Sequence, residues 1–98
     1  MPLKTIPFDA AETLNSPDEI DAFLEDAFDS GDPAFIAHAL GIVARAKGMS
    51  RLADETGLSR QALYKALSAE GHPEFATVLK VANALGFRLH AARVRESA

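Results

Sequence analysis

Four polar side chains in the stretch SRQALYKAL would read DNA bases if they project from one face of a short helix. They are Arg60, Gln61, Tyr64 and Lys65. Arginine pairs bidentately with guanine and glutamine with adenine, while lysine and tyrosine suit phosphate oxygens or a thymine methyl group. Residues at the start of the preceding helix would lie near backbone phosphates. The predicted DNA-binding residues are Ser50, Arg51, Ser59, Arg60, Gln61, Tyr64 and Lys65.

The surrounding residues predict the corner that would position this helix. Ser50 is expected to cap a helix over 51–56, and Ser59 a second helix over 60–67. Gly57 lies between them and supplies a position that tolerates positive φ. A plain helical corner in a small bundle uses the same small residues. The basic residues that gather around this corner favour a helix-turn-helix that binds double-stranded DNA.

Caps and apolar periodicity indicate three further helices. Ser16 and Asp32 each precede a proline, at the starts of helices expected over 17–30 and 33–47, and a last helix is expected over 74–85. Ser16 also forms an S-x-x-E capping box. Apolar residues recur at three- and four-residue spacing in all three. Those expected to face inward include Phe23, Leu24, Phe28, Phe35, Leu40, Val43, Phe75, Val78 and Leu85.

Both ends of the chain are expected to be extended. Residues 3–9, LKTIPFD, contain Pro7 and therefore suit an edge strand or an extended arm. Residues 87–94, FRLHAARV, alternate apolar and polar side chains, which predicts a half-buried strand. The expected fold class is mainly α, a five-helix bundle with short terminal β-strands. Its expected parts are an N-terminal arm and acidic helix (1–31), a helix-turn-helix bundle (32–86) and a C-terminal strand and tail (87–98), the last for dimerisation.

The charge is divided unevenly along the chain, whose formal net charge is −4. Residues 1–33 hold nine acidic residues and one basic residue, a net −8, whereas residues 34–98 hold nine basic and five acidic residues, a net +4. Such a division points to two different partners, although an acidic helix that only keeps the protein in solution is the simpler alternative.

Several functional classes find little support in the sequence. There is no cysteine, and His38, His72 and His90 lie far apart, so we expect no metal site. An acid–base pair built on His38 or His72 would be the enzymatic alternative, but no nucleophile motif or phosphate loop accompanies it, so we expect neither enzymatic activity nor a cofactor. No apolar run is long enough to span a bilayer, and no signal peptide is evident. We expect a soluble, cytoplasmic protein.

The stretch ARAKGMSRLADETGLSRQALYKALS, followed by the P-x-F-x-T-V-L-K-V pattern and ALG, closely resembles a known family. This family is the addiction-module antidote proteins with an Xre/Cro-type helix-turn-helix, the HigA-like antitoxins. FDAAETLNSPDEIDAFLEDAF also takes part, so the resemblance covers residues 8–89. It implies an antitoxin that neutralises a small basic RelE/HigB-like ribonuclease and represses its own operon as a dimer. Ser59, Arg60, Gln61, Tyr64 and Lys65 match the recognition-helix positions.

The resemblance does not fix the residues that contact the toxin or the second copy. Because a basic ribonuclease would be attracted to carboxylates, the acidic helix is the expected toxin surface. The expected toxin-binding residues are Asp18, Asp21, Glu25 and Asp26. The expected dimerisation residues, on the C-terminal strand, are Phe87, Leu89 and Ala91. A free-standing Xre-family repressor without a toxin partner is the alternative function.

Overall fold

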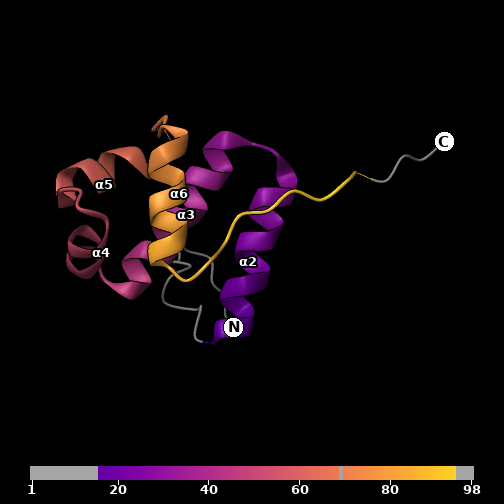
Figure 1. Ribbon diagram of the computed structural model, residues 1–98, viewed down its shortest axis with the longest axis horizontal. Coiled ribbons are helices and arrows are strands. Elements are labelled where there is room, and N and C mark those ends of the chain that lie inside the picture. Colours follow the sequence, from indigo (N-terminus) through magenta and orange to yellow (C-terminus); the bar gives the residue numbers. More distant parts are fainter. Residues whose placement is uncertain (1–15, 69, 95–98) are drawn as a thin grey trace, which may run out of the picture.

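The computed structural model describes residues 16–68 and 70–94, and within them the chain forms five helices and no strand. In Figure 1, α3 and α6 lie between α2 on one side and α4 with α5 on the other. The mainly α class and the five helices predicted from the sequence are confirmed. The helices are α2 (Pro17–Ser30), α3 (Pro33–Lys47), α4 (Met49–Thr56), α5 (Arg60–Ala66) and α6 (Phe75–Ala84).

Side-chain caps fix the starts of α2 and α3 as the sequence predicts. Ser16 Oγ accepts a hydrogen bond from the Glu19 N–H at 3.2 Å, and the Glu19 carboxylate accepts one from the Ser16 N–H, also at 3.2 Å. At the start of α3, the Asp32 carboxylate accepts a hydrogen bond from the Ala34 N–H at 3.0 Å. These caps satisfy amide groups that have no partner inside the helix, and each contributes about 1 kcal/mol.

The junction between α3 and α4 differs from the prediction. Gly48, with φ 113° and ψ 114°, both ends α3 and begins α4. The helix therefore starts at Met49, and Ser50 lies inside its first turn. No side chain caps α4, so the prediction that Ser50 does so was wrong. One glycine serves both helices here, which leaves no separate cap position.

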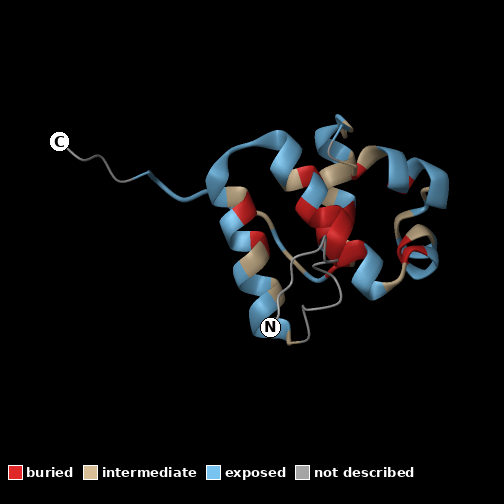
Figure 2. Cartoon of the chain, turned by 180° about the vertical axis from the view of Figure 1, so that it is seen from behind, coloured by how far each residue is buried: buried red, intermediate tan, exposed pale blue. Residues whose placement is uncertain are grey.

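α3 is the central helix of the hydrophobic core. It packs against each of the other four described helices, and its Leu40 and Val43 are almost fully buried. Figure 2 shows the buried residues gathered in the middle of the fold. Burying a leucine side chain contributes about 1.5–3 kcal/mol, so this core, more than local propensity, stabilises helices as short as α4 and α5. The other helices contribute Leu24, Ala27, Leu52, Leu63, Val81 and Ala82.

Two aromatic side chains that were predicted to face inward are exposed instead. Phe35, in the first turn of α3, is 36% exposed, and Phe75, the first residue of α6, is 69% exposed. Both lie at the start of a helix, where fewer neighbours surround a side chain than in its middle turns. Further along the chain, Val78 in α6 and Leu85 directly after it pack on the core as predicted.

The C-terminal segment does not form the predicted strand. Residues 87–94 carry no regular secondary structure, although the Phe87 N–H donates a hydrogen bond to the Ala82 carbonyl at 2.8 Å and Phe87 packs on the core. A strand needs a neighbour for its ladder of hydrogen bonds, and the described part of this single chain offers none. The predicted N-terminal strand or arm, residues 3–9, lies outside the described residues.

Candidate nucleic-acid interface

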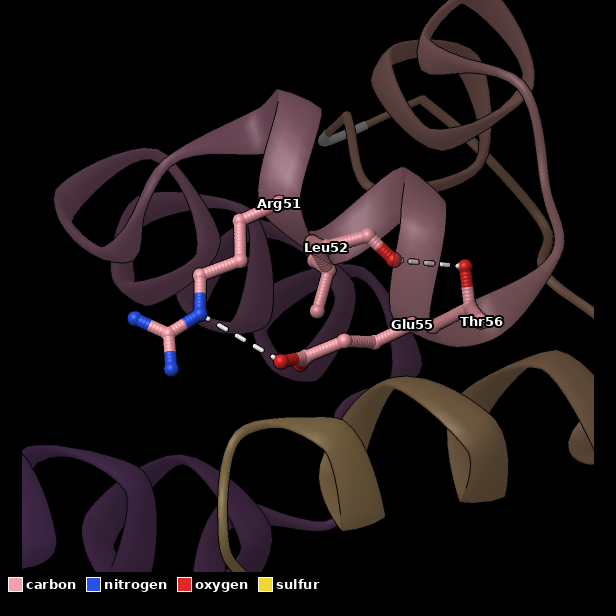
Figure 3. Close-up of polar contacts among 4 residues, drawn as sticks. All are labelled: Arg51, Leu52, Glu55 and Thr56. Atoms are coloured by element: carbon pink, nitrogen blue, oxygen red, sulfur yellow. Dashed lines mark hydrogen bonds and ion pairs between the residues drawn. The ribbon is translucent and has the colours of Figure 1, made fainter.

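The turn between α4 and α5 is held by one glycine and one threonine. Gly57 adopts φ 77° and ψ 10°, and its N–H donates a hydrogen bond to the Ala53 carbonyl at 2.9 Å. Thr56 Oγ1 donates a hydrogen bond to the Leu52 carbonyl at 2.8 Å (Figure 3) and accepts one from the Leu58 N–H at 3.2 Å. The left-handed conformation at Gly57, which suits a residue without Cβ, was predicted. The role of Thr56 was not, although a threonine directly before a turn glycine is a signal that sequence reasoning can use.

α5 begins where the sequence places it. Ser59 Oγ accepts a hydrogen bond from the Ala62 N–H at 3.0 Å, which confirms Ser59 as the cap. Leu63 and Leu67 on the inner side of this segment are buried in the core. The rigid core therefore determines which side of α5 faces solvent.

The outer side of α5 carries the four polar residues that were predicted to face outward. Arg60, Gln61, Tyr64 and Lys65 are all exposed. Their spacing places them on one face of the helix, opposite the buried leucines. The Arg60 guanidinium carbon lies 6.0 Å from the centroid of the Tyr64 ring, at the outer limit of a cation–π contact. α5 therefore presents a continuous hydrogen-bonding face that includes two cations.

Ser50 and Arg51, the two candidate residues on α4, are also exposed, but Arg51 forms an ion pair within the helix. Arg51 Nε lies 3.3 Å from Glu55 Oε2, and these side chains are 70% and 43% exposed (Figure 3). An exposed pair of this kind is worth about 0.2–1 kcal/mol, so Arg51 can exchange Glu55 for another anion at little cost. Lys47 lines the same shallow depression as Arg51 and Glu55. Sequence reasoning did not consider Glu55, whose charge moderates the positive field of the corner.

α2 carries the opposite charge along its exposed side. Asp18, Asp21, Glu25 and Asp29 follow one another at spacings of three, four and four residues, and we call this line the acidic stripe. All of them are exposed, as is Asp26 beside the stripe. No residue of the stripe forms an ion pair with any described residue. The residues predicted to bind a toxin therefore lie on one accessible surface.

Three of the four stripe residues do not help the helix, whereas Asp18 lies in its first turn, where the helix dipole favours an anion. Like charges four residues apart, such as Asp21 and Glu25, destabilise a helix by about 0.2–0.5 kcal/mol per pair. Asp29 lies in the last turn of α2, where the helix dipole disfavours an anion by about 0.3–1 kcal/mol, and that turn has no basic residue. Because Asp21, Glu25 and Asp29 do not stabilise α2, their presence calls for an explanation outside the fold.

Other kinds of site find no support among the described residues. No three His, Asp or Glu side chains of residues 16–68 and 70–94 gather in an arrangement able to hold a metal ion. His38 and His72 are exposed, and neither forms a hydrogen bond or ion pair within that part of the chain. Of the described helices, none combines the length and hydropathy that crossing a bilayer requires.

The described part of the chain is a small all-helical fold with an exposed basic corner, and comparison with known proteins gives its family. Residues 4–93 match the family model described as probable addiction module antidote protein. The chain is also 44% identical over 88 residues to an uncharacterized protein of Haemophilus influenzae, a match that covers 90% of this chain and 91% of that protein. No solved structure shows a significant match.

The chain therefore belongs to the family of probable addiction module antidote proteins. Membership of this family indicates an antitoxin role, and an antidote implies a toxin partner. The part of the resemblance that concerned the antidote family is thus confirmed.

Proposed function

We propose that this chain is the antitoxin of a type II toxin–antitoxin module. It neutralises a basic RelE/HigB-like ribonuclease toxin, and as a dimer it represses its own operon by sequence-specific DNA binding. The corner of α4 and α5 is its Xre/Cro-type helix-turn-helix, with α5 as the recognition helix. The protein acts in the cytoplasm by binding alone, without catalysis or a cofactor. Family membership supports the antitoxin role.

The exposed polar face of α5 is the observation that carries the DNA-binding part. Its inner leucines are buried, so the outer face is presented by a rigid element, and α5 is short enough to lie across a major groove. A good bidentate contact from Arg60 to guanine, or from Gln61 to adenine, is worth about 1–3 kcal/mol of discrimination. Lys65, and Arg51 once it leaves Glu55, supply phosphate contacts that position the helix.

The acidic stripe supports the toxin-binding part. A ribonuclease binds RNA phosphates and is therefore expected to carry positive charge, which carboxylates on α2 would attract. Opposite charges accelerate the association of two proteins, and the acceleration falls as salt is added. A partner would explain why Asp21, Glu25 and Asp29 are present, because these three carboxylates do not stabilise their own helix.

The C-terminal segment supports dimerisation. Phe87 is anchored on the core, while residues 88–94 have no ladder partner in the described part of the chain. Pairing with the same segment of a second copy would supply the missing hydrogen bonds and form the strand that the alternating sequence predicts. A dimer would also place two recognition helices on half-sites one helical turn apart.

Fluorescence anisotropy tests the DNA-binding part of the proposal. It compares a duplex from directly upstream of the chain's own gene with a scrambled duplex of the same composition. We expect Gln61→Ala to reduce the difference in affinity between the upstream duplex and the scrambled duplex. Lys65→Ala should weaken binding to both and reduce the slope of log affinity against log salt by about 0.9. Lys80→Ala is the matched control, because Lys80 is an exposed lysine on α6, outside the proposed interface.

If Lys65→Ala and Lys80→Ala lower DNA affinity equally, only the net charge of the protein matters, and the proposal that α5 contacts DNA is wrong.

A growth assay tests the antitoxin part. Expression of the protein encoded beside this chain should arrest growth, and co-expression of this chain should relieve the arrest. If that neighbour is harmless and does not bind the chain, while the upstream duplex is bound specifically, the function is that of a free-standing repressor.

A further inference from the structure

A groove of about 750 Å³ is lined by residues that lie outside α4 and α5. It lies between the end of α2, the start of α3, the loop of residues 71–73, the first turns of α6 and residues 89–91. Its walls are mostly apolar. The main lining side chains are Phe28, Ile36, Phe75, Val78, Leu79 and Leu89.

Phe75 is the feature that the fold itself does not explain. It lines the groove and is 69% exposed, the most exposed phenylalanine among the described residues. A concave apolar surface with an exposed aromatic side chain is typical of a site that receives apolar side chains from another molecule. The periodicity of α6 predicts that Phe75 faces inward, which agrees with a side chain that is buried only when the groove is filled.

The wall formed by residues 71–73 is held in a fixed position. The Gly71 N–H donates a hydrogen bond to the Ser68 carbonyl at 3.0 Å. A Cβ at Gly71 would lie 2.5 Å from the carbonyl oxygens of both Lys65 and Ala66, so the loop approaches the end of α5 more closely than any other residue type allows. A groove with such a wall is largely formed before a partner arrives.

The groove and the acidic stripe adjoin on α2. Phe28 lies in the groove, and Glu25 precedes it by three residues, so the two side chains are neighbours on the helix surface. Asp29, the next residue after Phe28, continues the stripe past the groove. One end of the apolar groove therefore meets a line of carboxylates that have no ion-pair partner among the described residues.

We propose that the groove and the acidic stripe form one docking surface for a basic segment of the toxin. A large apolar side chain of that segment enters the groove against Phe75, and lysine or arginine residues beside it lie along the stripe. This inference rests on the proposed antitoxin function and adds to it the place and the chemistry of the contact. The stripe accelerates association, while the groove slows dissociation.

The backbone of residues 89–91 can still pair with a second copy, but a second copy fits the groove and the acidic stripe less well. A two-fold contact brings the same patch of both copies together. The carboxylates of Glu25 and Asp29 at the rim would then enter one interface from both sides, and like charges placed together cost several kcal/mol. A basic segment removes that cost by pairing with them.

Surface plasmon resonance tests the proposal, with the protein encoded beside this chain immobilised as the probe. Phe75→Ala should raise the dissociation rate at least 10-fold and leave the salt dependence of association unchanged. Phe35→Ala is the matched control: Phe35 is also an exposed phenylalanine in the first turn of a helix but does not line the groove, and this variant should dissociate like wild type. Thermal unfolding of both variants checks that they are folded.

The outcomes separate this inference from the function on which it rests. If the unmodified chain does not bind the probe, the proposed antitoxin pairing fails and the inference fails with it. If the unmodified chain binds and Phe75→Ala dissociates no faster than Phe35→Ala, only the inference is overturned. If Phe75→Ala converts a dimer to a monomer in sedimentation while toxin binding is unchanged, the groove belongs to a second copy and the inference is likewise wrong.

Discussion

Replacing Gly41 with alanine tests whether the contact between α3 and α5 holds the candidate interface in place. Gly41 lies in the middle of α3 and is buried. A Cβ there would overlap the carbonyl oxygen of Leu67 and would lie 3.3 Å from the Leu67 Cβ. Leu67 ends α5, and its N–H donates a hydrogen bond to the Leu63 carbonyl at 2.9 Å. The overlap can therefore be relieved only by moving the end of α5 away from α3.

Two opposing effects decide the result of Gly41→Ala. Alanine in place of a glycine inside a helix stabilises it by about 0.8–1 kcal/mol. Forcing an extra methyl group into a packed core costs about 1–3 kcal/mol, and a clash with backbone belongs at the upper end of that range. We therefore expect a net loss of about 1–2 kcal/mol, which lowers the Tm of a domain of this size by roughly 4–16 °C.

Urea unfolding followed by circular dichroism measures this change. Ala46→Gly is the matched control, because Ala46 is exposed on the same helix and its substitution costs only the propensity of about 1 kcal/mol. At a temperature where both variants are folded, Gly41→Ala should also weaken operator binding, whereas Ala46→Gly should not. If Gly41→Ala is as stable as wild type or more stable, the packing argument is refuted.

Three further results are expected. Thr56→Val leaves the Leu58 N–H without its partner, so we expect a loss of about 1–2 kcal/mol in urea unfolding; an unchanged midpoint would show that the turn does not depend on this hydroxyl. The double reversal Asp21→Lys/Glu25→Lys should slow toxin association at least 10-fold at low salt, with little difference at high salt, and should not weaken DNA binding. Association rates equal to wild type at low salt would rule out steering by α2. Truncation after Arg88 should abolish the dimer in sedimentation and lower operator affinity, whereas a persistent dimer would place the interface elsewhere.

The features that the sequence predicts correctly depend on residues close together in the chain. The capping box of Ser16 and Glu19, the Asp32 and Ser59 caps and the turn at Gly57 each involve partners within four residues. Local hydrogen bonds of this kind are set by residue type and spacing alone. The outward face of α5 was predictable for the same reason, because the Ser59 cap and the inward leucines lie within the same short segment.

One missed feature is local: Ser50 has the right residue type for a cap, but Gly48, two residues earlier, ends α3 and begins α4. The other missed features depend on contacts between distant residues. Helical spacing predicts that Phe75 faces inward, but its side chain borders an open groove. Segments of α2, α3, residues 71–73 and residues 89–91 form the other walls of this groove, and the spacing of α6 does not reveal them. A strand over residues 87–94 needs a partner strand, which alternation of side chains cannot supply. The position of Phe75 and the C-terminal strand therefore depend on tertiary or quaternary neighbours.

The separation of the two charged surfaces is compatible with the proposed DNA binding by a protein whose net charge is −4. Among the described helices α2 packs only against α3, while α5 packs against α3 and α4, and Figures 1 and 2 show α2 and α5 on opposite sides of the fold. Two interhelical spacings amount to about 16–20 Å, or about two Debye lengths at physiological salt. Repulsion between the acidic stripe and phosphates at α5 is therefore strongly screened, and the cations of the corner dominate the local field. In the proposed function, the same separation would leave the acidic stripe accessible while α5 lies on DNA, so that one small domain could hold two partners of opposite charge.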